Sequence, residues 1–410
     1  MKQKRNYAVA KVSKKAENSV NNGHPWIYDT EIRDIDGEYE NGGLVDVTTE
    51  SGKYLGTGFI SNTSKIRIRL ISKNANDKFD YAFWERRLRY AWEYRKTVMG
   101  EDIKCCRIIF GEADQFPGLT IDRFNDVLVT QTLSLGIEKI KNMLFNIIYK
   151  ILIEDGQEIK GIYERNDVAI RELEGLEQNK GWFKLEKVDE IPKETFTYIV
   201  ENGVKYKVDF ENGQKTGFFL DQKYNRQAVA KIAKGKRVLD CFTHTGSFAL
   251  NAAMGGADYV CAVDISQSAV DMAKENAILN NLEEKMSFKA ANVFDLLPEM
   301  EKTNSEKFNF IILDPPAFTK SRKTVESARK GYKEINLRAM KLLPRGGYLA
   351  TCSCSHFMPD ELFVKMLKSA AKDAAVELRQ IEARQQSADH PILWNVPETD
   401  YLKFYIFQIV

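Results

Sequence analysis

From residue 235 onward, short apolar runs alternate with helical segments, and this alternation constrains the fold more than any other feature of the chain. Alternation of this kind predicts a mostly parallel sheet whose crossover helices cover its faces. We therefore expect this part of the chain to form an α/β, doubly wound sheet. The expected strands are residues 237–241, 259–264, 286–290, 308–313 and 347–352.

The chain before residue 196 has a different pattern. Residues up to about 75 contain short alternating runs and turns, such as 44–48 and 66–71, and predict a small β-rich module behind a basic arm that includes Lys2 and Lys4. The following residues mix helical and strand patterns. At roughly 150 residues per domain, a chain of 410 residues suits two or three domains. We predict three domains, which are residues 1–75, 76–195 and 196–410.

Composition narrows the class of protein. The chain has 60 Lys and Arg against 58 Asp and Glu, and this formal net charge of +2 argues against a protein that coats nucleic acid by bulk charge. Six cysteines without C-x-x-C spacing and four histidines favour neither a disulfide framework nor a metal site. We see no run of roughly 18 uncharged apolar residues and no signal-type apolar stretch behind the basic arm. We therefore expect a cytoplasmic protein without membrane contact.

Acidic residues stand at the ends of several expected strands. The first strand contains Asp240 and passes through a turn with Gly246 into a helix, and the next strand ends at Asp264. Ligands of open α/β sheets bind at the carboxyl ends of the strands, where an acid such as the second can accept hydrogen bonds from both hydroxyls of an adenosine ribose. Asn292 follows the third strand and Asp314 the fourth, while the glycine pattern differs from that of a dinucleotide site. This set resembles the class I S-adenosylmethionine methyltransferases.

Two features bear on which atom would be methylated. Asp314-Pro-Pro resembles the loop of enzymes that methylate exocyclic amines, although Ala317 separates the prolines from Phe318. Carbon 5 of a pyrimidine is a poor nucleophile, and enzymes that methylate it usually add a thiolate to carbon 6. The fifth strand ends in Cys352-Ser-Cys354, whose two thiols point to the same face. We favour Cys354 as the nucleophile because it lies nearer the strand tip; the alternative is that both cysteines are buried small apolar residues.

Three strings together narrow the resemblance: Lys215–Gln222, Asp240–Phe248 and Ser353-Cys354-Ser355. They resemble the bacterial RlmI-type family, whose members are 23S ribosomal RNA cytosine-5 methyltransferases. The C-terminal strings Ala388–Pro391 and Pro397–Lys403 fit this family as well. The family combines an N-terminal PUA domain, a central α+β domain and a Rossmann-like class I methyltransferase sheet, mostly parallel and seven-stranded. The resemblance implies S-adenosyl-L-methionine as cofactor, ribosomal RNA as partner and no metal. It is also compatible with a homodimer.

Carried onto matching positions, the resemblance implies a role for each residue. Asp240, Thr245 and Gly246 would line the methionine end of the cofactor, whereas Asp264 would hold its ribose. Asp314 would face the target base and Cys354 would attack carbon 6, so that these two form the catalytic set. Other RNA cytosine-5 methyltransferases carry the nucleophile in a Thr-Cys-Ser string, which here is residues 351–353, and Cys352 stays an alternative. The implied cofactor-binding residues are Lys215, Thr216, Phe218, Phe219, Asp240, Phe242, Thr245, Gly246, Asp264, Ile265, Ser266, Asn292, Val293 and Asp314.

Several roles stay open. The base that removes the carbon 5 proton could be His356, Asp314, His390 or water. A target base in RNA must be unpaired or flipped out of its stack, and an aromatic side chain could then stack on it or belong to the core. The aromatic candidates are Phe318, Phe357 and Trp394.

A basic run follows the Asp-Pro-Pro loop. Residues 317–345, among them Lys320, carry nine basic and two acidic side chains, a net charge of +7 that could hold RNA phosphates beside the chemistry. A solvated helix face is the alternative interpretation. Two other functions also stay open: methylation of a base amine through the Asp-Pro-Pro loop, and a non-catalytic RNA-binding role in ribosome assembly.

Overall fold

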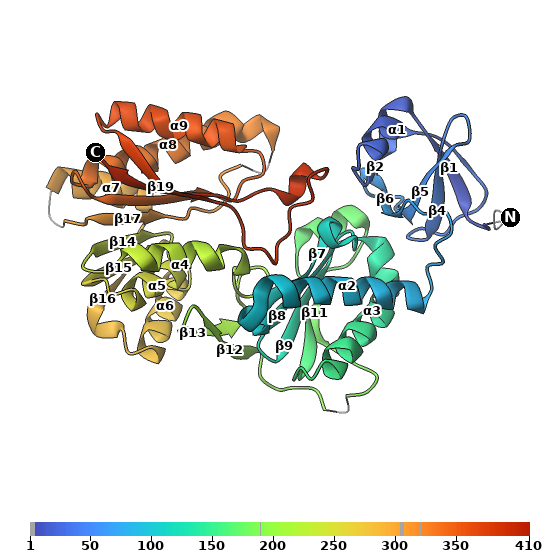
Figure 1. Ribbon diagram of the computed structural model, residues 1–410, viewed down its shortest axis with the longest axis horizontal. Coiled ribbons are helices and arrows are strands. Elements are labelled where there is room, and N and C mark those ends of the chain that lie inside the picture. Colours follow the sequence, from blue (N-terminus) through green and yellow to red (C-terminus); the bar gives the residue numbers. More distant parts are fainter. Residues whose placement is uncertain (1–4, 189, 304–306, 320) are drawn as a thin grey trace. The chain divides into compact units, whose positions relative to one another are not determined.

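The computed structural model describes residues 5–188, 190–303, 307–319 and 321–410, so Lys2, Lys4 and Lys320 lie outside the described residues. The chain divides into two compact units (Figure 1). The predicted three-domain boundaries stay a prediction. The first unit contains Met1–Ile199, Lys207–Leu220 and Ala388–Thr399, and the second contains Val200–Tyr206, Asp221–Ser387 and Asp400–Val410.

The N-terminal module of the first unit is β-rich, as predicted. Among the described residues it forms a six-stranded sheet in the order β2-β6-β5-β4-β1-β3. Alternate residues of β1 are buried, and Ala10 and Val12 join Val47 and Ile68 in its core. The side chain of Ser13 caps the helix of this module by accepting from a backbone N–H. The elements are β1 (Ala8–Val12), α1 (Lys14–Asn21), β2 (Trp26–Tyr28), β3 (Ile32–Asp36), β4 (Leu44–Thr49), β5 (Tyr54–Ile60) and β6 (Ile66–Ser72).

The central part of the first unit is an α+β layer. Its described strands form a five-stranded sheet in the order β11-β10-β9-β8-β7, in which only β9 and β10 run parallel. Arg69 of the N-terminal module pairs with Glu112 and Glu174 of this layer, so the module is anchored to it. The elements are α2 (Tyr81–Met99), β7 (Cys105–Phe110), β8 (Leu119–Phe124), β9 (Val127–Thr132), α3 (Leu135–Glu154), β10 (Gly161–Arg165) and β11 (Lys180–Phe183).

A hairpin follows the central layer. Its strands β12 (Phe196–Glu201) and β13 (Val204–Asp209) pair with one another across a turn at Asn202 and Gly203. Both turn residues have positive φ, 53° and 80°, which is the conformation that a tight two-residue hairpin requires. This requirement accounts for the Asn-Gly pair at the turn.

The second unit contains the predicted α/β sheet. In the part of the chain that the structure describes, the sheet has seven strands in the order β16-β15-β14-β17-β18-β20-β19. The strand β20 pairs antiparallel with both β18 and β19, and the other described pairs of this sheet are parallel, which confirms a mostly parallel sheet. The strands are β14 (Arg237–Cys241), β15 (Tyr259–Asp264), β16 (Met286–Ala290), β17 (Phe310–Leu313), β18 (Tyr348–Ser353), β19 (Leu378–Arg384) and β20 (Lys403–Ile409).

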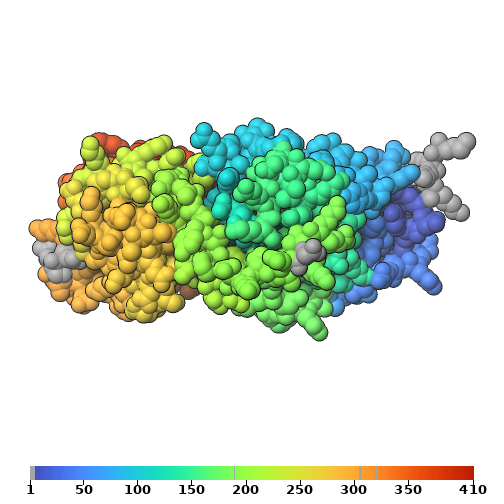
Figure 2. Space-filling view, turned by 90° about the horizontal axis from the view of Figure 1, so that it is seen from below, coloured from blue at the N-terminus to red at the C-terminus, as the bar shows by residue number. Residues whose placement is uncertain are grey.

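Helices cover both faces of this sheet. In Figure 1, α8 and α9 lie on one face and α4, α5 and α6 on the other. Figure 2 views the second of these faces, where the residues of α5 and α6 appear yellow to orange. Leu239, Ile311 and Leu349 of neighbouring strands are buried in the core, and each such side chain contributes about 1.5–3 kcal/mol. The helices are α4 (Lys223–Ile232), α5 (Ser247–Met254), α6 (Gln267–Leu279), α7 (Val293–Thr303), α8 (Val325–Leu342) and α9 (Asp360–Asp373).

Candidate active site

Three acids predicted from the strand pattern lie at one edge of the seven-stranded sheet. Asp240 is the next-to-last residue of β14, Asp264 is the last residue of β15, and Asp314 directly follows β17. These strands are parallel neighbours in the order β15-β14-β17, so their carboxyl ends meet. The topology therefore brings together the acids that the sequence predicted as ligand-binding groups.

Asp240 is a buried carboxyl group in which one oxygen accepts hydrogen bonds and the other does not. Its Oδ2 accepts hydrogen bonds from Thr243 Oγ1 at 2.6 Å and from the Ala249 backbone N–H at 2.9 Å. Its Oδ1 is buried and has no hydrogen-bond partner among the described residues. Burial, and then the charges of Asp314 and Asp264, raise the pKa of Asp240 to about 8. A cationic ligand would relieve this cost, so the group fits the ammonium of S-adenosylmethionine.

The turn after β14 is bent in a way that ordinary side chains avoid. Phe242, His244 and Gly246 have positive φ values of 66°, 49° and 82°. A Cβ at Gly246 would also lie 2.9 Å from the Ala273 Cβ, so only glycine fits there. The Oγ1 of Thr245, within this turn, has no hydrogen-bond partner in the described chain. Strained backbone beside an unused donor is typical of a ligand-binding turn.

Asp264 is held by the main chain. Its Oδ2 accepts from the His244 N–H at 2.9 Å and its Oδ1 from the Ser266 N–H at 3.0 Å. These bonds fix the carboxylate while leaving lone pairs that could accept from ribose hydroxyls. Ile265 is exposed, whereas the Ser266 hydroxyl caps α6 by accepting from Ala269 N at 3.3 Å. The backbone therefore fixes the orientation of the carboxylate predicted to hold the ribose.

Asn292 has a local structural task. Its side chain donates to Asp295 Oδ2 at 2.9 Å and accepts from the Phe294 N–H at 3.1 Å, so it caps the start of α7. Val293 is buried below it. The predicted contact of this pair with adenine stays a prediction.

Four predicted cofactor residues belong to the first unit. Thr216 is buried and donates from Oγ1 to Asp122 Oδ2 at 2.6 Å. Phe218 is buried as well, whereas Lys215 Nζ lies 4.8 Å from the ring centroid of Phe219. The bond to Asp122 gives Thr216 a structural role, and a cofactor role for these four residues stays a prediction.

The two cysteines at the end of β18 have different surroundings. Cys352 is 1% exposed, and its Sγ donates to Asp314 Oδ1 at 3.0 Å and to the Leu313 carbonyl at 3.3 Å. Burial and the neighbouring carboxylate raise the pKa of Cys352 well above its ordinary value, so this thiol stays protonated. Cys354 is partly exposed, with its Sγ 4.0 Å from the Pro315 carbonyl oxygen. All six cysteines lie within the described residues, and the other five are buried.

Gln222 joins this group although the sequence suggested no role for it. Its Nε2 donates to Asp314 Oδ1 at 3.1 Å and to Cys352 Sγ at 3.5 Å, and its Oε1 accepts from Asn225 Nδ2 at 2.7 Å. Burial raises the pKa of Asp314 to about 6, and the bonds from Cys352 and Gln222 act in the opposite direction. The signal in the sequence was the position of Gln222 at the end of the Lys215–Gln222 string.

The candidate bases and stacking residues are dispersed. His390 belongs to the first unit, where it is 2% exposed and its Nδ1 lies 2.9 Å from Asp389 Oδ1. His356 belongs to the second unit, where its ring packs edge-on against Phe357. Burial and the acidic partner favour a structural role for His390. Of the aromatic candidates, Trp394 is 93% exposed in the first unit, and Phe318 packs against Tyr332 in the second.

Ion pairs divide the basic run of residues 317–345. Near the C-terminal end of α8, Arg338 and Lys341 both pair with Glu301, and Lys333 pairs with Asp373. The cations without an ion pair therefore lie mainly just before α8 and in its first half, and phosphate binding by the run stays a prediction. In the described part of the run, the exposed cations without an ion pair are Arg322, Lys323, Lys330 and Arg345.

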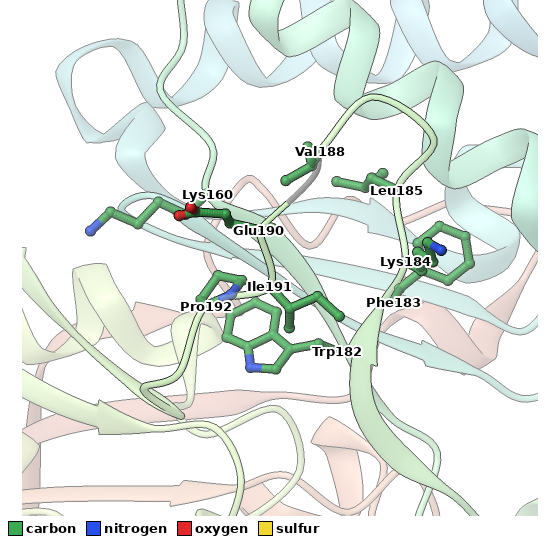
Figure 3. A pocket seen from close by; sticks show the side chains of 10 residues that line it. Lys160, Trp182, Phe183, Lys184, Leu185, Val188, Glu190, Ile191 and Pro192 are labelled. Carbon is green, nitrogen blue, oxygen red and sulfur yellow. The ribbon is translucent and has the colours of Figure 1, made fainter.

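A separate cavity in the first unit is too small to matter for a nucleotide or cofactor. Trp182, Ile191 and Pro192 are among its lining residues (Figure 3). Its volume of about 10 Å³ is close to the space for a single water.

Within the described ranges, no group of three or more His, Cys, Asp and Glu could hold a metal ion. Nor does any described helix have the length and apolar character of a membrane span.

Comparisons with known proteins agree with this geometry. A family model of S-adenosylmethionine-dependent methyltransferases matches residues 179–403, and a model of PUA-like domains matches residues 10–73. Curated proteins named "Ribosomal RNA large subunit methyltransferase I" from Shigella dysenteriae and Tolumonas auensis are 38% and 39% identical over 97% of this chain and 98% of their own length.

A solved structure shows the same fold. A Streptococcus mutans chain described as a candidate SAM-dependent methyltransferase has a TM-score of 0.79 and 21% identity, and the match covers 98% of this chain and 99% of the other. Another candidate methyltransferase, complexed with SAH, gives the same TM-score at 20% identity and the same coverage. The N-terminal PUA-like module and S-adenosylmethionine as cofactor, both predicted from the sequence, are thus confirmed. The chain belongs to the S-adenosylmethionine-dependent methyltransferase family, among relatives that carry the name ribosomal RNA large subunit methyltransferase I.

Proposed function

We propose that the protein methylates carbon 5 of a cytosine in 23S ribosomal RNA, through a covalent bond between Cys354 and carbon 6 of the base. The observation that carries this proposal is the contrast between the two cysteines of β18. Cys354 is partly exposed beside the Asp314 loop, whereas Cys352 is a buried, protonated thiol that donates to Asp314. The names of the relatives support ribosomal RNA of the large subunit as the substrate. A protein that acts on this substrate would work in the cytoplasm.

The proposed chemistry follows from these groups. Bound S-adenosylmethionine supplies an electrophilic methyl group. The Cys354 thiolate forms a carbon–sulfur bond at carbon 6, and the electron pair of the ring double bond then makes carbon 5 nucleophilic. After carbon 5 is methylated, its proton leaves to a base, the carbon–sulfur bond breaks, and the thiolate is restored. Asp314, a carboxyl group with a pKa raised to about 6, can hold the N3 and N4 edge of the base during these steps.

Bisulfite treatment of 23S ribosomal RNA tests the product. RNA from a deletion strain should lose protection at one cytosine, and a plasmid copy of the wild-type gene should restore it. The C354A variant should fail to restore protection, while the matched C352A variant should restore it. An unchanged pattern of protected cytosines in the deletion strain would contradict the cytosine-5 assignment.

A second candidate function keeps the cofactor and changes the target atom. Asp314-Pro315-Pro316 resembles the loop of enzymes that methylate exocyclic amines, and such chemistry needs no cysteine. In that case C354A should methylate RNA at the wild-type rate. Mass spectrometry of nucleosides from the reaction would identify a methylated amine instead of 5-methylcytosine.

A further inference from the structure

A buried lysine lies beside the segment that carries Cys354. Lys403 begins β20 and is the register partner of Ser353 in the antiparallel pair β18–β20. The residue is 6% exposed, and its Nζ donates to the backbone carbonyls of Ser355 and Tyr401, at 2.8 Å each. One of these carbonyls belongs to the residue directly after Cys354. The ammonium group thus fixes the backbone on which the proposed nucleophile sits.

An ammonium is a costly group to place there. Taking a charged amine out of water is unfavourable unless an opposite charge or full hydrogen bonding compensates for it. Among the described residues Lys403 has no carboxylate within 4.0 Å, and its hydrogen-bond acceptors are two neutral carbonyls. Two carbonyls could be satisfied by a neutral donor as well. The position therefore suggests a use for the positive charge itself.

The charges that face Lys403 point to Cys354. Burial lowers the pKa of Lys403 to about 8, while negative charge on Asp400, Cys354 and Asp360 acts to raise it. The two carboxylates accept hydrogen bonds from neutral donors, Asp400 from Gln385 Nε2 at 3.2 Å and Asp360 from Tyr405 Oη at 2.6 Å, and both keep their charge. With a pKa of about 8, Lys403 is mostly protonated at pH 7. The sulfur of Cys354 is the one group of these three that takes part in the proposed chemistry.

The neighbouring phenol supplies no competing charge. Tyr332 Oη accepts from Ser353 Oγ at 3.0 Å and shares a 3.1 Å hydrogen bond with Ser355 Oγ. It therefore bonds the residue before Cys354 and the residue after it. Burial raises the pKa of Tyr332 to about 12, so its hydroxyl stays neutral at the working pH. Tyr332, Ser353 and Ser355 hold the segment in place, and Lys403 adds the charge.

We propose that Lys403 is a positioning residue that stabilises the thiolate form of Cys354 and fixes the Ser353–Ser355 backbone around it. This inference rests on the proposed function, in which Cys354 is the nucleophile. The thiol proton goes to solvent, and Lys403 keeps its own proton. A positive charge held against the carbonyl of the residue after Cys354 favours the thiolate over the thiol and so raises the thiolate population at neutral pH.

Alkylation of the full-length protein tests the charge. Because the other five cysteines are buried, iodoacetamide should react mainly at Cys354, and C354A measures the background. In K403M the midpoint of the rate–pH profile should rise by about one unit, so that the rate at pH 7 falls about tenfold. K403R keeps the charge and should stay near the wild-type profile. Equal profiles for K403M and wild type would overturn the inference.

A reciprocal measurement does not depend on the folding of K403M. Because coupling between two sites is mutual, removing the thiolate should lower the titration midpoint of Lys403. NMR of ¹³C-labelled lysine in wild type and C354A should show this shift, and identical Lys403 titrations would contradict the inference. Methylation assays separate the two levels: activity in C354A refutes the nucleophile, whereas an inactive C354A with an unshifted Lys403 refutes only the role of the lysine.

Discussion

The two halves of the seven-stranded sheet hold their polar groups in different ways. In the half formed by β14 and β15, Asp264 is bound by the backbone N–H groups of His244 and Ser266, and Asp240 accepts one bond from the backbone of α5. In the half formed by β17, β18 and β20, the bonds are mainly between side chains, as in the Gln222–Asp314–Cys352 group. Backbone donors depend on the turn geometry, whereas side-chain groups depend on residue identity and protonation.

This difference predicts different consequences of mutation. Substitutions in the β14–β15 half should change cofactor affinity, because its acids are the predicted contacts of the methionine and ribose parts of the cofactor. Substitutions in the β17–β18–β20 half should change the rate of the chemical step and its dependence on pH. The predictions below test this division and the RNA contacts beside it.

Loss of the Cys354 thiol should have the largest effect. C354A should lower the single-turnover methylation rate by about 10³-fold or more, because the covalent step is lost. The matched variant C352A removes a buried thiol that donates to Asp314 and should cost about tenfold or less. Rapid-quench assays with a ribosomal RNA fragment measure both. An inactive C352A beside an active C354A would move the nucleophile to the buried cysteine.

Loss of the Asp240 charge should weaken cofactor binding. D240N should lower the affinity for S-adenosylmethionine by about 10- to 100-fold, the usual cost of a lost charge-assisted bond, while leaving the rate at saturation closer to wild type. Calorimetry measures the affinity. Gln267→Ala, which removes an exposed side chain of α6 that donates to Asp271 on the same helix, is the matched control and should change the affinity little.

Asp240 also predicts a pH dependence. With a pKa of about 8, the free protein holds this carboxyl mostly protonated at pH 7, whereas a bound ammonium favours the carboxylate. Cofactor binding at pH 7 should therefore release a proton, and affinity should increase as the pH rises towards about 8. Because the folded pKa is raised above the unfolded one, the stability contributed by the protonated group is lost as the pH rises through about 8. Binding heats in buffers of different ionisation enthalpy would show no proton release in D240N.

The strand pattern predicted the first half of the site better than the second. Asp240, Asp264 and Asp314 could be placed because parallel strands bring their carboxyl ends to one edge. Gln222 and Lys403 could not be placed in the same way, since Gln222 precedes the sheet in sequence and Lys403 comes from the antiparallel strand β20. The register between β18 and β20, which sets Lys403 opposite Ser353, is a tertiary property without a local sequence signal. Burial also distinguishes the two cysteines of β18, which sequence spacing could not do, because Cys352 is buried and Cys354 is partly exposed.

Loss of the Gln222 amide should have a moderate effect on the rate of the chemical step, which depends on the β17–β18–β20 half. The bond from Gln222 to Asp314 stabilises the charged form of the carboxyl, so its removal should raise the pKa of Asp314 above about 6. The acidic limb of the kcat–pH profile should move upward in Gln222→Leu, and kcat at pH 7 should fall about fivefold. Asn225→Ala tests the next bond in the chain and should have a smaller effect. A change in cofactor affinity alone would place Gln222 in the other half of the site.

Removal of free cations at the start of α8 should have the smallest effect, and on RNA binding alone. Each phosphate contact that is lost should lower the slope of log affinity against log salt by about one and weaken binding a few-fold at physiological salt. Arg322→Ala and Lys323→Ala should show this change, because these exposed side chains have no ion pair among the described residues. The control is R338A, whose guanidinium already pairs with Glu301 and Glu334 and is therefore less available to phosphates. Equal salt slopes for R322A and R338A would mean that net charge along the whole run, and not the free cations near the Asp314 loop, attracts the RNA.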